Sequence, residues 1–168
     1  MTVLVAGLGN VFCSDDGFGV AVVEELAKRD LPPDAEVRDF GIRGIHLAYQ
    51  LLEPYDLVVL VDAVQRGGPP GTVYVIEAEP GAEPGEEVIM DAHDLGPDAV
   101  LSLVPRLGGT VGPVVVVGCE PAGLDAGIGL SPAVQDSVGT AVQMVIDLVT
   151  RQVAGPADRP VGVTEGES

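Results

Sequence analysis

The chain has 168 residues, about the size of one ordinary domain, with no internal repeat and no linker that would split it. Apolar residues make up 46% and aromatic residues only 4%, so Val, Ala, Leu and Ile must build the core, which suits a buried parallel sheet. The net charge of −18 repels phosphate backbones and anionic headgroups, which makes nucleic acid and membrane surfaces poor partners. This charge serves solubility alone or attracts a basic partner segment.

The first forty residues predict a strand, a helix and a second strand. The apolar run 2–6 opens directly into Gly-Leu-Gly-Asn and predicts a central strand. A helix should follow from Ser14 or Asp15 to Arg29, because both residues are good N-caps and apolar residues recur behind them at helical spacing. Charged residues interrupt the next strand, at 35–40, so this strand should lie near a sheet edge.

The middle of the chain predicts a helix and two strands. The glycine loop 41–44 precedes a helix that should end near Leu52. The run 56–62 is nearly all apolar and ends in a carboxylate, which predicts the strongest strand of the chain. After a Pro/Gly turn, the alternation at 72–77 predicts a strand that can run antiparallel. The helix that follows the glycine loop should turn these side chains inward: Ile45, Ala48, Leu51 and Leu52.

The remaining segments complete an α/β pattern. In order, they are an acidic loop at 78–90, a helix at 94–107, a buried strand at 114–118, a Gly-rich loop at 120–130 and a helix at 131–153. Strands that alternate with helices predict an α/β fold: a three-layer α/β/α sandwich with a mostly parallel, doubly wound sheet of about five strands. We expect residues 1–154 to form one domain and 155–168 a flexible polar tail.

A dinucleotide site is one reading of Gly7 and Gly9, with Asp39 as the acidic residue after the second strand. However, Phe12 stands where the third glycine is needed, so the close contact between helix and strand should be lost. The chain also contains no P-loop lysine, no GxSxG and no HExxH motif. An NTPase, an α/β-hydrolase and a self-contained zinc peptidase are therefore disfavoured.

Three dispersed residues can converge on one edge of the sheet. Asp15 and Asp16 begin a helix, where Asp15 is expected to be the cap and Asp16 the ligand. Asp62 ends an apolar strand, where an unpaired carboxylate could not be buried, and His93 lies on a loop just before a helix. If the first strand lies between the second and third, the switch point of the sheet brings these residues together. Two carboxylates and an imidazole suit a divalent metal ion.

The two cysteines are too few for a disulfide scaffold, and the chain has no CxxC motif. We expect Cys13 and Cys119 to act as small apolar residues rather than nucleophiles. No basic region precedes the first apolar run, which is short, so neither a signal peptide nor a transmembrane helix is expected. The expected location is the cytoplasm.

The chain resembles the [NiFe]-hydrogenase maturation endopeptidases over roughly residues 2–150. The resemblance is carried by the opening VLVAGLGNVFCSDDGFGV, by the loop Gly41-Ile-Arg-Gly44, by Val61-Asp62-Ala63, by His93, and by VGCEP and GLSP between Val117 and Pro132. It implies an endopeptidase that removes a C-terminal extension from the hydrogenase large-subunit precursor after nickel insertion.

The resemblance also implies roles for individual residues. The metal-contacting and catalytic positions of the family match Asp16, Asp62 and His93, and the glycine loop would contact the substrate through Gly41, Ile42, Arg43 and Gly44. Many relatives carry Glu in place of Asp16 and Thr in place of Ile42. The metal would be nickel that the substrate supplies, so the purified protein should be mostly free of metal, and we expect a monomer. The metal or a ligand carboxylate would activate water or polarise the scissile carbonyl.

Two other functions fit the same sequence. A non-hydrolytic nickel-binding assembly chaperone on this fold would bind the precursor and leave its mass unchanged. A nucleotide-binding regulator would bind nucleotide saturably and be indifferent to nickel.

Overall fold

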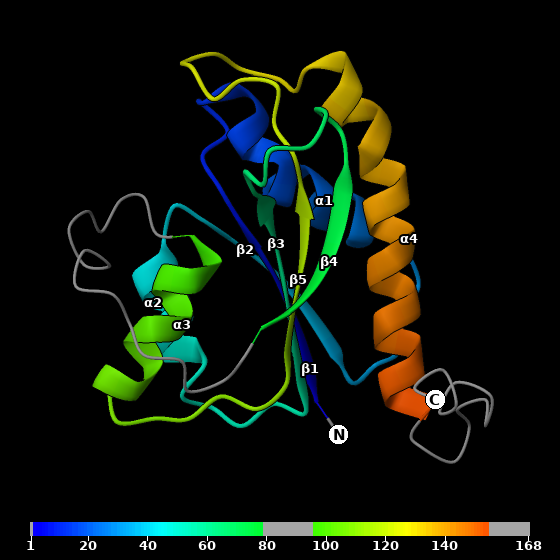
Figure 1. The fold of residues 1–168 in the computed structure, drawn as a ribbon. Helices are drawn as coiled ribbons and strands as arrows, with labels where there is room; N and C mark the ends of the chain where they lie inside the picture. The colour runs from blue at the N-terminus through cyan, green and yellow to red at the C-terminus, as the bar shows by residue number, and fades with distance from the viewer. Residues whose placement is uncertain (1, 79–95, 155–168) are drawn as a thin grey trace, which may run out of the picture.

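The computed structural model describes residues 2–78 and 96–154 of the chain. Within them, five strands form one sheet in the order β2-β1-β3-β5-β4, with helices on both of its faces (Figure 1). The elements are β1 (Val3–Leu8), the 3₁₀ helix η1 (Ser14–Gly17), α1 (Phe18–Leu26), β2 (Ala35–Gly41), α2 (Gly44–Gln50), β3 (Leu57–Ala63), β4 (Val73–Ala78), α3 (Pro97–Arg106), β5 (Val114–Cys119) and α4 (Pro132–Ala154).

The sheet matches the predicted fold class. β1, β2, β3 and β5 are parallel, whereas β4 pairs antiparallel with β5, and the charged strand β2 lies at one edge. The acidic loop expected at 78–90, the first residues of the helix expected at 94–107, and the tail 155–168 lie outside the described residues, apart from Ala78, which ends β4. No helix in the described segments has both the length and the apolarity needed to span a membrane.

The alternation of side chains along the buried strands creates two separate cores. Val3 and Val5 of β1 face one side, where α1 and α4 cover the sheet. Leu4 and Ala6 face the other side, where α2 and α3 pack. Because successive strand residues point to opposite faces, a strand such as β1 must be apolar throughout when both faces are covered. This arrangement is the predicted three-layer sandwich.

The topology places the ends of three strands side by side. Gly7 of β1 pairs with Asp39 of β2 and with Val61 of β3, so the residues that follow these strands emerge at one edge of the sheet. The crossover from β1 to β2 contains α1 on one face, and the crossover from β2 to β3 contains α2 on the other. The switch point predicted between β1 and β3 is therefore confirmed, and it is where ligands bind in open α/β sheets.

The predicted first helix is wrong at both ends. A 3₁₀ turn precedes α1, Ser14 has a φ of +54° that an α-helix does not allow, and α1 ends at Leu26 rather than at Arg29. Neither Ser14 nor Asp15 caps this segment, because the N-cap position of η1 is Cys13 and no side chain caps it. The prediction failed because both side chains bind a distant loop instead, which local sequence does not reveal.

The orientation of α2 was only partly predicted. Leu47, Ala48 and Leu51 are buried, whereas Ile45 and Leu52, which were expected to face inward, are exposed. α2 has only seven residues and packs against α3 along one narrow stripe. Ile45 lies roughly 100° around the helix from the centre of that stripe, and Leu52 lies beyond the end of α2.

Candidate active site

The turn that follows β1 orients the first predicted ligand. Gly9 has a φ of +133°, and a Cβ atom there would collide with the backbone carbonyl of Asp16, so only glycine fits. The next residue, Asn10, donates its backbone N–H to Asp16 Oδ2 at 2.9 Å. The Asn10 side chain in turn accepts the backbone N–H of Phe12 at 2.9 Å. The loop thus holds one oxygen of the Asp16 carboxylate at a defined position.

Asp62 faces the same turn from β3. Its side chain is buried, and Oδ1 accepts the backbone N–H of Ala63 at 2.8 Å. The same oxygen lies 3.5 Å from the position that a Cβ atom on Gly9 would occupy. Asp16 and Asp62 therefore both border the segment Gly9–Asn10, at the carboxyl edge of the sheet.

The third predicted ligand, His93, lies outside the described residues. The described chain resumes at Gly96, the N-cap of α3, where a Cβ atom would lie 3.9 Å from Asp62 Oδ2. Residues 2–78 and 96–154 contain no group of three His, Cys, Asp or Glu side chains that could hold a metal ion. The structure thus brings two of the three predicted ligands to one edge, and the complete set stays a prediction.

The glycine loop lies against the Gly9 turn. Gly9 donates its N–H to the carbonyl oxygen of Gly41 at 2.9 Å, and Gly41 itself has a φ of +53°. The Arg43 side chain folds back on the loop, donating from Nε to Phe40 O at 3.2 Å and from Nη2 to Asp39 O at 2.6 Å. These contacts hold the loop at the edge that carries the two carboxylates. Ile42 is exposed there, and Gly44 begins α2.

Asp15 is a buried anchor for a distant loop, not the helix cap expected from the sequence. Its Oδ2 accepts the backbone N–H groups of Ala122 at 2.8 Å and Gly123 at 3.2 Å, and the hydroxyl of Ser131 at 2.9 Å. Its Oδ1 accepts the Ser131 N–H at 2.7 Å. Burial alone would raise the pKa of Asp15, but the hydrogen bonds from Ser131, Ala122 and Gly123 outweigh it and hold the pKa below its ordinary value. In the sequence, the only signal for this role was that two aspartates, Asp15 and Asp16, stand side by side where one would suffice as a cap.

A second buried carboxylate, Glu120, follows β5 and was also missed. Its Oε1 accepts the N–H groups of Arg66 at 2.9 Å and Gly68 at 3.2 Å, and the Tyr74 hydroxyl at 2.7 Å. The hydrogen bond from Arg66, followed by that from Tyr74, lowers the pKa of Glu120, and the same contact raises the pKa of Tyr74. Glu120 therefore shapes the turn between β3 and β4.

Cys119 behaves as expected for a small apolar residue, whereas the expectation for Cys13 stays a prediction. Cys119 is fully buried at the end of β5, and burial raises the pKa of its thiol to about 11, so the thiolate required of a nucleophile is scarce at neutral pH. Cys13 is partly exposed and bridges through its backbone to Gly127. Both cysteines are free thiols.

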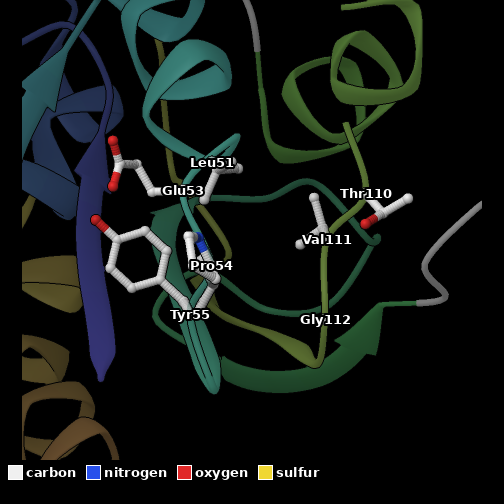
Figure 2. Close-up of a pocket in the computed structure, with 8 residues that line it drawn as sticks. Leu51, Glu53, Pro54, Tyr55, Thr110, Val111 and Gly112 are labelled. Atoms are coloured by element: carbon white, nitrogen blue, oxygen red, sulfur yellow. The ribbon is translucent and has the colours of Figure 1, made fainter. Parts of the chain in front are cut away.

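A small hollow lies at the opposite edge of the sheet. Its volume is about 160 Å³, and it is formed by residues that precede β3 and β5 (Figure 2). Tyr55 and Thr110 belong to its lining, and Gln50 donates to the Tyr55 hydroxyl from outside it. Because ligands of open α/β sheets bind beyond the carboxyl ends of the strands, this hollow is separate from the candidate active site.

Comparison with known proteins gives one consistent family. Residues 20–148 match the family model described as hydrogenase maturation protease. The chain is 32% identical over 168 residues to the hydrogenase expression/formation protein HoxM of Cupriavidus necator, covering 99% of this chain and 83% of that protein. It is 31% identical over 147 residues to the hydrogenase 2 maturation protease of Escherichia coli, covering 87% of this chain and 89% of that protein.

A solved structure agrees with these relatives. The hydrogenase maturating endopeptidase HybD from Escherichia coli superposes with a TM-score of 0.74 and 28% sequence identity, covering 90% of this chain and 94% of that one. The family resemblance inferred from the motifs is thereby confirmed over both sequence and fold. This chain belongs to the hydrogenase maturation protease family, and it is an endopeptidase that acts in hydrogenase maturation.

Proposed function

We propose that this endopeptidase removes the C-terminal extension of a [NiFe]-hydrogenase large-subunit precursor after nickel insertion, and that nickel held by the substrate is its recognition element. The observation that carries the proposal is the placement of Asp16 and Asp62, which border the Gly9–Asn10 segment at the switch point of the sheet. A site with two oriented carboxylates in a family of maturation proteases suits a metal-bearing substrate.

The donor set fits a borderline divalent ion. Each carboxylate accepts a backbone N–H, Asp16 from Asn10 and Asp62 from Ala63, which helps to orient it, and carboxylate oxygens are common ligands of divalent ions. His93 would complete the set, since it lies three positions before Gly96 and three residues span at most about 10 Å. None of the three is a thiolate, so affinity for free nickel should be modest. When bound, nickel would supply Lewis-acid polarisation of the scissile carbonyl or of water.

The protein's own groups would position the substrate and move a proton. Asp16 or Asp62 accepts the proton of the attacking water, because a carboxylate beside the scissile bond can act as a general base. The loop Gly41–Gly44 would hold the extension, with Ile42 exposed next to Gly41, which accepts a hydrogen bond from Gly9.

Cleavage of a nickel-loaded precursor tests this function. The precursor is incubated with the enzyme, and its mass is followed over time. Asp16→Ala, Asp62→Ala and His93→Ala should each slow cleavage by more than about 100-fold, whereas Asp34→Ala, an exposed residue at the opposite edge, should cleave at the parent rate. Full activity in any one of the three variants removes that residue from the mechanism.

The same assay separates the alternatives. A precursor that binds the parent protein but never changes mass indicates an assembly chaperone instead. Asp16→Asn and Asp62→Asn identify the base, because Asn keeps an oxygen ligand but accepts no proton. The variant that still binds the nickel-loaded precursor and fails to cleave it marks that carboxylate as the base.

A further inference from the structure

Two loops at the edge of the candidate active site display large apolar side chains to solvent. One loop joins β1 to η1, and the other joins β5 to α4 (Figure 1). Phe12 is 65% exposed and Ile128 is 82% exposed. Single exposed apolar residues are ordinary, but a group on adjoining loops beside an active site indicates an interaction surface. We refer to this group as the loop platform, and its members are Val11, Phe12, Leu124 and Ile128.

The two loops are held together rather than left mobile. Gly127 donates its N–H to Phe12 O at 2.8 Å, and Ser14 donates to Gly127 O at 2.9 Å. The Ser14 hydroxyl donates to Asp125 O at 2.8 Å. The buried Asp15 carboxylate fixes both ends of the second loop through Ala122, Gly123 and Ser131. A Gly-rich loop held in this way presents its side chains with little entropy left to lose on binding.

The platform is also coupled to the predicted catalytic carboxylate. The backbone of Phe12 is hydrogen-bonded to the Asn10 side chain, and the backbone of Asn10 is hydrogen-bonded to Asp16. One short segment therefore both orients Asp16 and displays Phe12. Any partner that rests on the platform lies within a few residues' length of the site.

We propose that the loop platform docks an apolar patch on the folded body of the large-subunit precursor, next to the point where its C-terminal extension leaves that body. This inference rests on the proposed function. The residues on the amino side of the cut bond stay in the mature subunit, and each spans at most about 3.5 Å, so a body joined to the cut bond by only a few residues lies within reach of the loops that flank the site. The platform itself consists of four uncharged side chains on a protein of net charge −18, so the matching patch is apolar rather than basic.

Binding of purified, nickel-loaded precursor to immobilised protein tests the inference. Phe12→Ser and Ile128→Ser should each raise the dissociation constant about tenfold, and the double variant should raise it further. Phe12→Leu, which keeps an apolar side chain, should bind within about threefold of the parent. The control is Val75→Ser, because Val75 is 48% exposed on the edge strand β4 and lies outside the platform.

Salt and oligomeric state complete the test. If the contact is apolar, the double variant should lose the same factor in affinity for the precursor at low and at high NaCl concentration. Parent affinity in the double variant, a loss that disappears at high salt, or a parent chain that dimerises through the platform overturns the inference. Because all the substituted residues are exposed, each variant should keep the parent melting temperature.

Failure of this inference and of the proposed function are distinguishable. Normal cleavage with no dependence on Phe12 and Ile128 overturns the docking surface alone. Binding that depends on the platform, without any change in precursor mass, overturns the proteolytic function alone. A parent protein that does not bind the precursor overturns the docking surface.

Discussion

Asp15 and Asp16 are neighbours in the chain, yet they have different tasks. Asp16 points to the turn that follows β1, where Asn10 orients it. Asp15 points into the loop before α4 and receives four hydrogen bonds from three residues. The 3₁₀ turn separates the two side chains, so that one carboxylate serves the candidate site and the other holds the scaffold around it.

Replacing Asp15 by Asn should destabilise the protein. An amide supplies one acceptor oxygen and two unneeded N–H donors where the carboxylate satisfies four donors from Ala122, Gly123 and Ser131. The free energy of unfolding should fall by about 1–3 kcal/mol, measured by urea denaturation at neutral pH. Asp34→Asn, at an exposed position, is the control and should change little.

The same carboxylate should make stability depend on acid. Since hydrogen bonding lowers the pKa of Asp15 in the folded protein, the unfolded chain binds a proton at this carboxylate more readily. The stabilisation is complete above the unfolded pKa and is lost as the pH falls through the lower, folded pKa. Between about pH 5 and pH 3 the free energy of unfolding should therefore fall more steeply in the parent than in Asp15→Asn. Equal slopes would contradict this role.

At the scale of elements, two glycines in helices have opposite surroundings. A Cβ atom on Gly19 of α1 would meet the backbone carbonyls of Val61 and Leu8, so this glycine lets α1 press onto β1 and β3. Gly139 of α4 is exposed, and a Cβ atom there would touch nothing. The close contact between helix and strand that Phe12 was expected to abolish is thus restored by Gly19, although no dinucleotide motif is present.

Alanine at these two glycines should therefore have opposite effects. Gly139→Ala should raise the free energy of unfolding by about 0.5–1 kcal/mol, because alanine favours a helix. Gly19→Ala gains the same helical preference, but its free energy of unfolding should fall by about 1–3 kcal/mol or more because the new Cβ atom collides with the strands. Thermal and urea unfolding measure both. A Gly19→Ala protein as stable as the parent would show that α1 can move away from the sheet without loss.

At the scale of the whole molecule, charge is the dominant imbalance. The chain has 26 acidic and 8 basic residues, and the salt bridges within the described residues, Lys28–Glu25 and Arg38–Glu36, are both exposed. Most carboxylates therefore repel one another across the surface, which works against the compact state.

Added salt should stabilise the folded protein. Raising NaCl from about 10 mM to about 1 M shortens the Debye length from about 30 Å to about 3 Å and screens this repulsion. We expect the melting temperature at pH 7 to rise by a few degrees, and the rise should shrink near pH 4, close to the sequence pI of about 4.1. A melting temperature that falls with NaCl at pH 7 would contradict the argument.

Much of this fold could be predicted because its signals are local. The apolar runs of β1, β3 and β5 identify strands buried on both faces, and the alternation in β4 identifies a strand that can run antiparallel. Asp62 was placed correctly at the carboxyl edge because a carboxylate directly after an apolar strand has few other positions available. His93, the nickel, the monomeric state and the cytoplasmic location stay predictions.

The sequence alone determined the layers and the strands that are buried on both faces, because hydrophobic periodicity acts over a few residues at a time. The position of β1 between β2 and β3 was a condition of the predicted site, and the tertiary structure meets it. Only the tertiary structure decided which aspartate anchors a loop, which face of α2 is covered, and that Glu120 shapes the turn after β3. These outcomes depend on donors and packing partners that belong to other elements of the fold, such as Ala122 for Asp15 and Arg66 for Glu120, and no local pattern encodes such partners.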